Sequence, residues 1–148
     1  MVKQYFDIEE FVPQHIYEQL GDRAIKLINP AIIRVANVLR DVTGTPLTIN
    51  SWKWGGDRNW SGLRDTTSPY YSATSQHTFG NAIDIVSKRP AHELRAIILE
   101  DPELFPAVTF LECGISWVHI DVRPGNDVKL WVPKRGFITK DEFYAEQL

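Results

Sequence analysis

The sequence predicts one α+β domain in which helices flank a small antiparallel sheet. The chain has 148 residues, enough for one domain with a buried core. Amphipathic helical periodicity dominates residues 7–44, whereas short β-type runs gather after residue 80. Helices and strands that segregate in this way are typical of the α+β class. The sequence contains no repeat or obvious linker, so we predict a single domain over residues 1–148.

Helical segments are expected before residue 45. Residues 7–20 carry two short helical signals. A longer helix is predicted to have Asn29 as its N-cap and Pro30 as its first residue, and to end at Gly44. Its apolar residues recur at helical spacing: Ile32, Ile33, Val35, Ala36 and Leu39.

The second half of the chain is predicted to supply two more helices and most of the strands. Residues 90–100 form an amphipathic pattern, and Thr139 is expected to cap a final helix that runs through Tyr144. The expected strands are residues 47–50, 82–86, 108–111, 117–122 and 128–132.

Residues 51–74 have no regular periodicity and are crowded with aromatic side chains, among them Trp52, Trp54 and Trp60. A loop of this length inside a compact domain is usually functional or disordered, and the aromatic content argues against disorder. Two interpretations remain open. The rings fill the core, because aromatic residues carry much buried area, or they line a groove beside a site.

Composition excludes several classes of protein. The net charge of -3 gives no general attraction to nucleic acid. Cys113 is the only cysteine, which excludes a disulfide framework and a cysteine-based metal cluster. A metal site would therefore use histidine and carboxylate ligands. Because no apolar run approaches the roughly 20 residues that cross a bilayer, we expect no membrane segment.

The densest group of chemically capable residues surrounds His77 and Asp84. His77 is expected in a turn and Asp84 on the strand that follows, with Gly80 between them to let the chain bend. Strand alternation then places His119 and Asp121 on one face of a later strand, opposite an apolar face. Two imidazoles and one carboxylate would leave the fourth position of a tetrahedral zinc open, as in catalytic sites.

Spacing alone leaves the ordinary alternatives open. A single histidine is more often a hydrogen-bonded structural residue than a ligand, and Asp84 alone would also suit a turn. The surrounding residues strengthen the metal interpretation. They form the string S-x-H-x-x-G-x-A-x-D followed by W-V-H, matched by Ser75, His77, Gly80, Ala82, Asp84, Trp117, Val118 and His119.

This string resembles the zinc D-alanyl-D-alanine carboxypeptidase family. The family includes D-Ala-D-Ala dipeptidases and the L-alanyl-D-glutamate endopeptidases of phage endolysins. The resemblance covers residues 47–123. It implies a hedgehog/D-Ala-D-Ala peptidase-like fold and one zinc ion per chain, held by His77, Asp84 and His119.

The resemblance extends upstream to Ser61-Gly62-Leu63-Arg64, which looks like the family element S-G-aromatic-R with leucine in place of the aromatic residue. It implies that Arg64 binds a substrate carboxylate or stabilises the oxyanion, both of which suit a guanidinium. A surface salt bridge is the plain alternative for Arg64. Ser75 is expected to shape the turn around His77 and to contact substrate.

The sequence differs from the family pattern at the residue expected to act as general base. Better-known members carry an acidic residue three positions before the last zinc histidine, and this chain has Ser116 there. We expect Glu112 to act as the base, because phage-type relatives often have a glutamate before a short turn and the W-V-H strand. Asp121 is the alternative base, or it orients His119.

The expected function is a zinc metallopeptidase, a peptidoglycan hydrolase that cleaves stem peptides containing D-alanine through a metal-activated water. Whether it is a carboxypeptidase or an endopeptidase stays open. One alternative is a zinc-binding virion or structural module with weak or no turnover. Another is a zinc-bearing signalling or scaffold domain of the same general fold, which the S-G-x-R element argues against.

Peptidoglycan peptides are the expected partners, and we expect a monomer. The N-terminus turns acidic at Asp7 before a signal-like apolar core develops. We therefore expect synthesis in the cytoplasm without a signal peptide. The protein would act there, or reach the cell wall by lysis or as a phage virion component.

Overall fold

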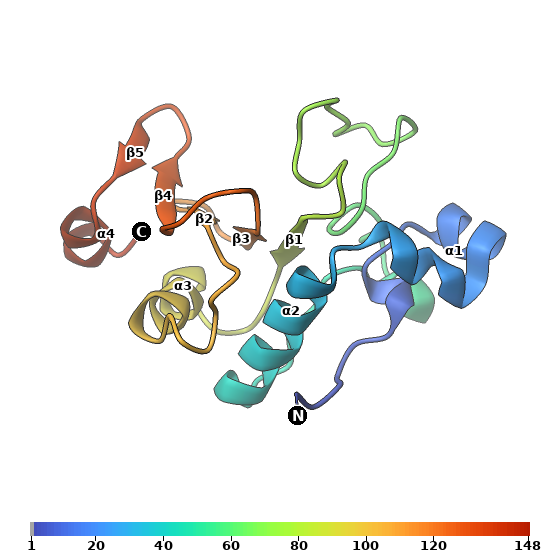
Figure 1. Cartoon of the computed structure of the whole chain (residues 1–148), viewed down its shortest axis with the longest axis horizontal. Coiled ribbons are helices and arrows are strands. Elements are labelled where there is room, and N and C mark those ends of the chain that lie inside the picture. Colours follow the sequence, from blue (N-terminus) through green and yellow to red (C-terminus); the bar gives the residue numbers. More distant parts are fainter. Residues whose placement is uncertain (1) are drawn as a thin grey trace.

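The computed structural model describes residues 2–148 as one mixed sheet with helices packed around it (Figure 1). The α-helices are α1 (Gln14–Leu20), α2 (Pro30–Thr43), α3 (Ala91–Glu100) and α4 (Lys140–Glu146). The 3-10 helices are η1 (Ile8–Glu10), η2 (Gly21–Leu27) and η3 (Trp52–Trp54). The strands are β1 (Ala82–Ile85), β2 (Phe110–Glu112), β3 (Val118–Asp121), β4 (Lys129–Val132) and β5 (Gly136–Ile138). The predicted α+β class is confirmed.

The sheet is mixed, so the prediction of an antiparallel sheet is wrong in one pair of strands. The strand order is β1-β3-β2-β4-β5, and β2 pairs with β4 in parallel while the other pairs are antiparallel. Because β3 already occupies one edge of β2, the chain must cross back to the other edge before β4 can pair. Strand periodicity assigns residues to strands but does not define which strands become neighbours.

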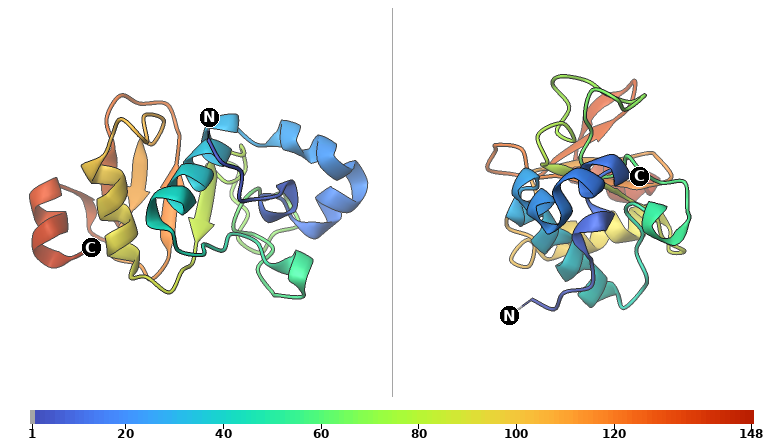
Figure 2. Two further views of the ribbon diagram at one scale, coloured as in Figure 1. Left: turned by 90° about the horizontal axis from the view of Figure 1, so that it is seen from below. Right: turned by 90° about the vertical axis from the view of Figure 1, so that its right-hand side faces the viewer.

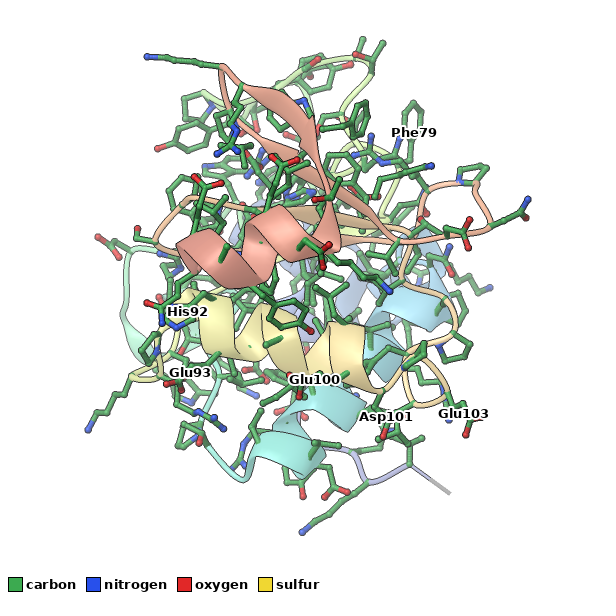
Figure 3. The ribbon with its side chains drawn as sticks, turned by 90° about the vertical axis from the view of Figure 1, so that its left-hand side faces the viewer. Phe79, His92, Glu93, Glu100, Asp101 and Glu103 are labelled. Carbon is green, nitrogen blue, oxygen red and sulfur yellow. The ribbon has the colours of Figure 1, made fainter. Side chains whose placement is uncertain are left out.

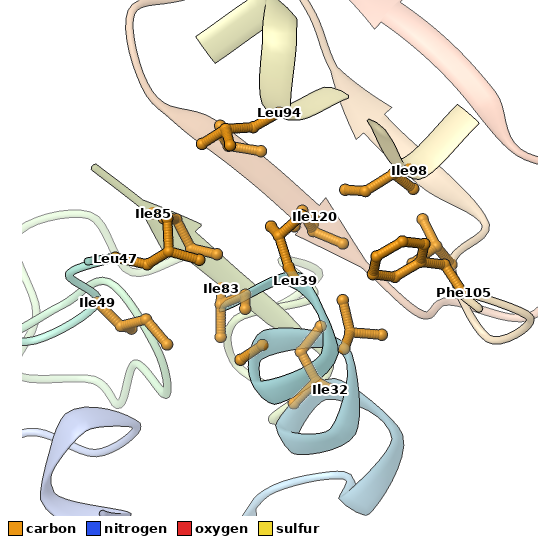
Figure 4. Packing of buried hydrophobic residues seen from close by; sticks show 14 of the residues in the cluster. Ile32, Leu39, Leu47, Ile49, Ile83, Ile85, Leu94, Ile98, Phe105 and Ile120 are labelled. Carbon is orange, nitrogen blue, oxygen red and sulfur yellow. The ribbon is translucent and has the colours of Figure 1, made fainter. Parts of the chain in front are cut away.

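The two faces of the sheet differ because successive side chains of a strand point to opposite sides. Helices α2 and α3 lie on one side, while the loop that precedes β1 rises on the other (Figures 1 and 2). The helix-covered side holds the apolar core. Its labelled members in Figure 4 are Ile32, Leu39, Leu47, Ile49, Ile83, Ile85, Leu94, Ile98, Phe105 and Ile120.

The helix predictions are confirmed in their main features. The side chain of Asn29 accepts a hydrogen bond from the Ala31 amide at 2.9 Å, and Gly44 ends α2 in the left-handed conformation at a φ of 62°. Thr139 caps α4 by accepting from the Glu142 amide at 3.1 Å. Helix α3 buries Leu94, Arg95, Ile98 and Leu99, and Figure 3 shows His92, Glu93 and Glu100 on its outer surface.

The predicted strand over residues 47–50 is reduced to a single bridge between Thr48 and Val86. Its continuation leaves the sheet, because the Asn50 amide donates to the Glu10 carbonyl and the Asn50 side chain donates to the Val12 carbonyl. Residues 108–111 were expected as a strand, but β2 begins at Phe110. Strand β5 and helix η2 were not predicted from the sequence.

The segment of residues 51–81 contains only the short helix η3 as regular structure. The N-terminal region fixes it in place, since the Val12 carbonyl accepts from the indole of Trp52 at 2.9 Å and the Phe11 carbonyl accepts from the Leu63 amide at 2.8 Å. Within residues 2–148, no helix combines the length and apolar character needed to span a membrane.

Candidate metal centre

His77, Asp84 and His119 converge on one point of the sheet. Each offers a ligand atom, and these atoms all lie within 4.8 Å of one another. The three residues are buried, with 3%, 8% and 8% of their surfaces exposed. The group could bind a metal ion. The predicted convergence of these three residues is therefore found in the structure.

Strand pairing and one tight turn bring the three side chains together. Asp84 on β1 lies directly opposite His119 on β3. His77 comes from the turn before β1, which closes at Gly80 with a φ of 70°. A Cβ atom at Gly80 would lie 2.1 Å from the carbonyl oxygen of Leu27. The turn that presents His77 therefore requires glycine at this position.

Hydrogen bonds fix which ring nitrogen each histidine presents. Nδ1 of His77 lies 2.8 Å from the Gly62 carbonyl oxygen, to which it can only donate, and this leaves Nε2 directed at Asp84, 3.3 Å away. Nδ1 of His119 lies 2.9 Å from Asp84 Oδ1, and its Nε2 lies 2.9 Å from Asp121 Oδ2. Such outer partners hold metal-binding imidazoles in one tautomer and orientation.

The charges of the group are strongly coupled. Burial alone would raise the pKa of Asp84, but hydrogen bonds from His119 and His77 outweigh it and hold that pKa well below its usual range. Burial likewise opposes protonation of His119, yet the hydrogen bonds to Asp121 and Asp84 raise its pKa to about 9. Without a metal ion, the carboxylates of Asp84 and Asp121 therefore compensate the positive charge of the His119 imidazole.

Asp121 is fully buried beneath the centre. Its oxygens accept from His119 and from the guanidinium of Arg123, whose Nε lies 2.7 Å from Oδ1. Burial alone would raise the pKa of Asp121. The hydrogen bonds from Arg123 and His119 have the larger effect and hold this pKa below its ordinary value. Two cavities, of about 700 Å³ and about 350 Å³, border His119, and Asp121 lines neither of them. Its position suits the orientation of His119 and not direct contact with substrate.

A cavity of about 700 Å³ opens over the three residues. Arg64 lines it and donates from Nη2 to Asp84 Oδ2 at 3.0 Å and from Nε to the Trp60 carbonyl at 2.7 Å. Burial lowers the pKa of Arg64, while the charge of Asp84 opposes this effect. Ser75 also lines the cavity, and its hydroxyl accepts from the His77 amide at 3.3 Å.

Glu112 also lies at the centre, as the last residue of β2 and directly opposite His119 in the register. It lines the cavity, and no ion pair or hydrogen bond of its carboxylate is found within residues 2–148. Ser116 is exposed in the turn that follows and lines neither of the two cavities that border His119. The structure therefore brings the carboxylate of Glu112, and not the side chain at position 116, to the cavity beside His119.

The aromatic side chains of residues 51–74, here called the aromatic loop, contribute walls to the cavity, and none of them belongs to the main core, to which this loop adds Leu63. Trp60 and Tyr70 line the cavity, together with Trp117 from the strand motif, whereas Trp54 is 63% exposed outside it. No tryptophan belongs to the hydrophobic core cluster of the described residues. The interpretation of a groove lined by rings is therefore the correct one for Trp60 and Tyr70.

Several residues of the site were not predicted from the sequence. They are Arg58 in the cavity, Arg123 beside Asp121, and the Gly62 carbonyl behind His77. For Trp60 and Tyr70, the crowding of aromatic residues indicated a groove as one of two interpretations and did not identify which rings line it. The other contacts depend on tertiary structure that has no local pattern.

No protein-family model, no curated protein and no solved structure matches the chain. The two short motifs around the metal centre thus remain a resemblance, and the geometry of the site carries the functional argument.

Proposed function

We propose that the chain is a zinc-dependent peptidase that hydrolyses peptidoglycan stem peptides containing D-alanine. The observation that carries this proposal is the convergence of His77, Asp84 and His119 on the floor of a cavity that Glu112 and Arg64 also line. The motif resemblance supplies the substrate class and the hedgehog/D-Ala-D-Ala peptidase-like fold. The α+β class of the chain agrees with that fold.

The donor set suits zinc. Two imidazole nitrogens and one carboxylate oxygen form the three-ligand pattern of catalytic zinc sites, and both histidines have their second nitrogen tied to an outer partner. When bound, zinc lowers the pKa of a water molecule and polarises the carbonyl group of the substrate.

In the proposed mechanism, Glu112 is the general base. Its carboxylate is free of protein partners within residues 2–148 and lies across the β2–β3 pair from His119. It accepts the proton of the attacking water and passes it to the amine that leaves. One carboxylate within hydrogen-bond reach is enough for both transfers.

Arg64 binds the substrate and stabilises the developing negative charge. Its guanidinium is held at the cavity wall by Asp84 and by the Trp60 carbonyl. A fixed cation in a partly buried site stabilises an oxyanion or a carboxylate more strongly than one in water. Asp121 is assigned a positioning role, because it touches His119 and Arg123 but not the cavity.

A second candidate function follows from Ser116. The acid of the better-known family members is absent there, which favours a zinc-binding virion or structural module with weak turnover. The two functions predict different results in one experiment. The module would contain zinc and bind cell-wall material without releasing any product.

The test is incubation of the full chain with purified peptidoglycan and with defined stem peptides, in the presence and absence of a chelator. We expect peptide fragments detected by mass, abolished by the chelator and restored by zinc. His77→Ala should abolish cleavage, whereas His92→Ala, on the outer surface of α3 (Figure 3), should leave it intact. Cleavage that survives in His77→Ala would overturn the proposal. The same fragments would also identify the bond that is cleaved.

Two further parts of the proposal concern the setting of the protein. The protein acts in the cytoplasm or reaches the cell wall by lysis or within a virion, and the working unit is the monomer. A sedimentation measurement on the zinc-loaded chain tests the second part. A dimer at micromolar concentration would contradict it.

A further inference from the structure

A second cavity adjoins the metal centre over strands β2, β4 and β5, and Thr74 at the end of the aromatic loop also lines it. Its volume is about 350 Å³, and Ser75, Glu112 and His119 line both cavities. The metal centre and Glu112 therefore lie where the two cavities meet. A substrate whose cleaved bond lies at Glu112 can extend into both of them.

The floor of the second cavity is a row of side chains in strand register. Glu112 on β2 is opposite Trp131 on β4, and Trp131 is opposite Phe137 on β5. All three line the cavity. Phe137 is 70% exposed, although a phenyl ring on a strand is normally buried. Two aromatic rings thus continue the surface that begins at the metal centre.

The strand spacing gives the distance of these rings from the cleaved bond. Neighbouring strands are about 4.8 Å apart, so along the row Trp131 lies about 5 Å and Phe137 about 10 Å from Glu112. An extended peptide advances about 3.3 Å per residue. The rings therefore lie beside groups two to three residues away from the bond that is cleaved.

The two cavities differ in charge. Arg58 and Arg64 line the first cavity together with the acidic residues Asp57, Asp84 and Glu112. Arg64 pairs with Asp84, whereas no ion pair of Arg58 is found within residues 2–148. Arg123 lines the second cavity, but Asp121 takes two of its nitrogen donors and the Phe110 ring covers its face at 3.6 Å. A free carboxylate of the substrate can therefore pair with Arg58 in the first cavity, whereas the second cavity offers an uncharged group the rings of Trp131 and Phe137.

We infer that Trp131 and Phe137 form a substrate-binding platform for the part of the peptide on the N-terminal side of the cleaved bond. This inference rests on the proposed peptidase function, in which Arg64 faces the carboxyl side. The ligand class is a peptide that extends at least two residues beyond the cleaved bond and carries an uncharged group over the rings. Apolar or ring-shaped groups pack on aromatic faces in this way.

The test uses a nested series of stem peptides that share their C-terminal residues and lengthen by one residue at a time on the N-terminal side. Both kcat/KM and the Kd of the zinc-loaded chain are measured for each peptide. In the wild-type protein, we expect kcat/KM to rise about tenfold and Kd to fall about tenfold once two to three residues precede the bond. Trp131→Ala and Phe137→Ala should lose most of this gain and retain the activity towards the shortest peptide.

Trp54→Ala is the matched control, because Trp54 is exposed and lines neither cavity. It should keep the full gain with length. The Phe137 ring is mostly exposed to solvent, so Phe137→Ala should fold normally. It therefore tests the platform even if Trp131→Ala fails to fold. Thermal unfolding of each variant checks this point.

Three results are distinguishable. A gain with length that both ring variants lose supports the platform. A wild-type protein that cleaves these peptides without any gain, or ring variants that keep it, would overturn the platform and leave the peptidase function standing. A zinc-loaded protein that neither binds nor cleaves any peptide of the series would overturn both.

Discussion

The two faces of the sheet use neighbouring residues of the same strands for different purposes. On the helix-covered face, Ile83, Leu111 and Ile120 are buried in the apolar core. On the cleft face, Asp84, Glu112 and His119 lie in one row across β1, β3 and β2. Each cleft residue is adjacent in sequence to a core residue. Stability and chemistry should therefore respond separately to substitutions only one position apart.

The largest effect is expected on the cleft face. Glu112→Gln keeps the shape of the side chain and removes the proposed base, so kcat should fall by about 10²–10⁴-fold. Zinc content and the free energy of unfolding should stay at the wild-type values. Glu100→Gln, on α3 and away from the cleft (Figure 3), serves as the control. Wild-type turnover in Glu112→Gln would remove this residue from the mechanism.

The neighbouring residue on the core face should behave in the opposite way. Leu111 is fully buried in β2, and Leu111→Ala should lower the free energy of unfolding by about 2–5 kcal/mol. At a temperature where the variant is still folded, its kcat should remain within a few-fold of the wild-type value. Urea denaturation and steady-state kinetics measure the two effects. A large loss of kcat without a loss of stability would show that the two faces are not separable.

The two faces also differ in how well the sequence predicts them. The core face follows from apolar periodicity, and the motifs around His77 and His119 place three cleft residues. The row from Glu112 to Trp131 and Phe137 could not be predicted, because it depends on the parallel pairing of β2 with β4 and on the unpredicted strand β5. Contacts between distant segments, such as His77 with Gly62, likewise leave no periodic signal.

A smaller effect is expected beneath the cleft face. Asp121→Asn keeps the size of the side chain but removes the charge that faces Nε2 of His119. Zinc affinity should weaken by about 10–100-fold, as is typical when an outer partner of a metal-binding histidine is lost. Competition with a chromogenic chelator measures the affinity. Asp127→Asn, at an exposed position, should have no effect, and equal affinities in the two variants would contradict the positioning role.

The smallest effect concerns a titratable group outside both faces. Burial raises the pKa of Glu10 from 4.5 to about 7, although the Asp7 backbone amide opposes this by donating to its carboxylate. The folded state then binds the proton more tightly than the unfolded state. The stabilising contribution is complete below pH 4.5 and is lost as the pH rises through 7.

Glu10→Gln stays neutral at every pH and can still accept the Asp7 hydrogen bond. It should therefore be more stable than the wild-type protein by about 2 kcal/mol at pH 8, with little difference at pH 4.5. Urea denaturation at the two pH values measures this, with the exposed Glu103→Gln as control (Figure 3). A difference that is independent of pH would contradict the raised pKa.

The metal content of the protein tests the central claim most directly. After zinc loading and removal of free metal, elemental analysis should find one zinc ion per chain in the wild-type protein and in His92→Ala. His77→Ala and His119→Ala should each retain almost none while remaining folded by circular dichroism. A wild-type chain without zinc, or a folded His77→Ala that holds a full equivalent, would contradict the assignment of His77, Asp84 and His119 as the metal centre.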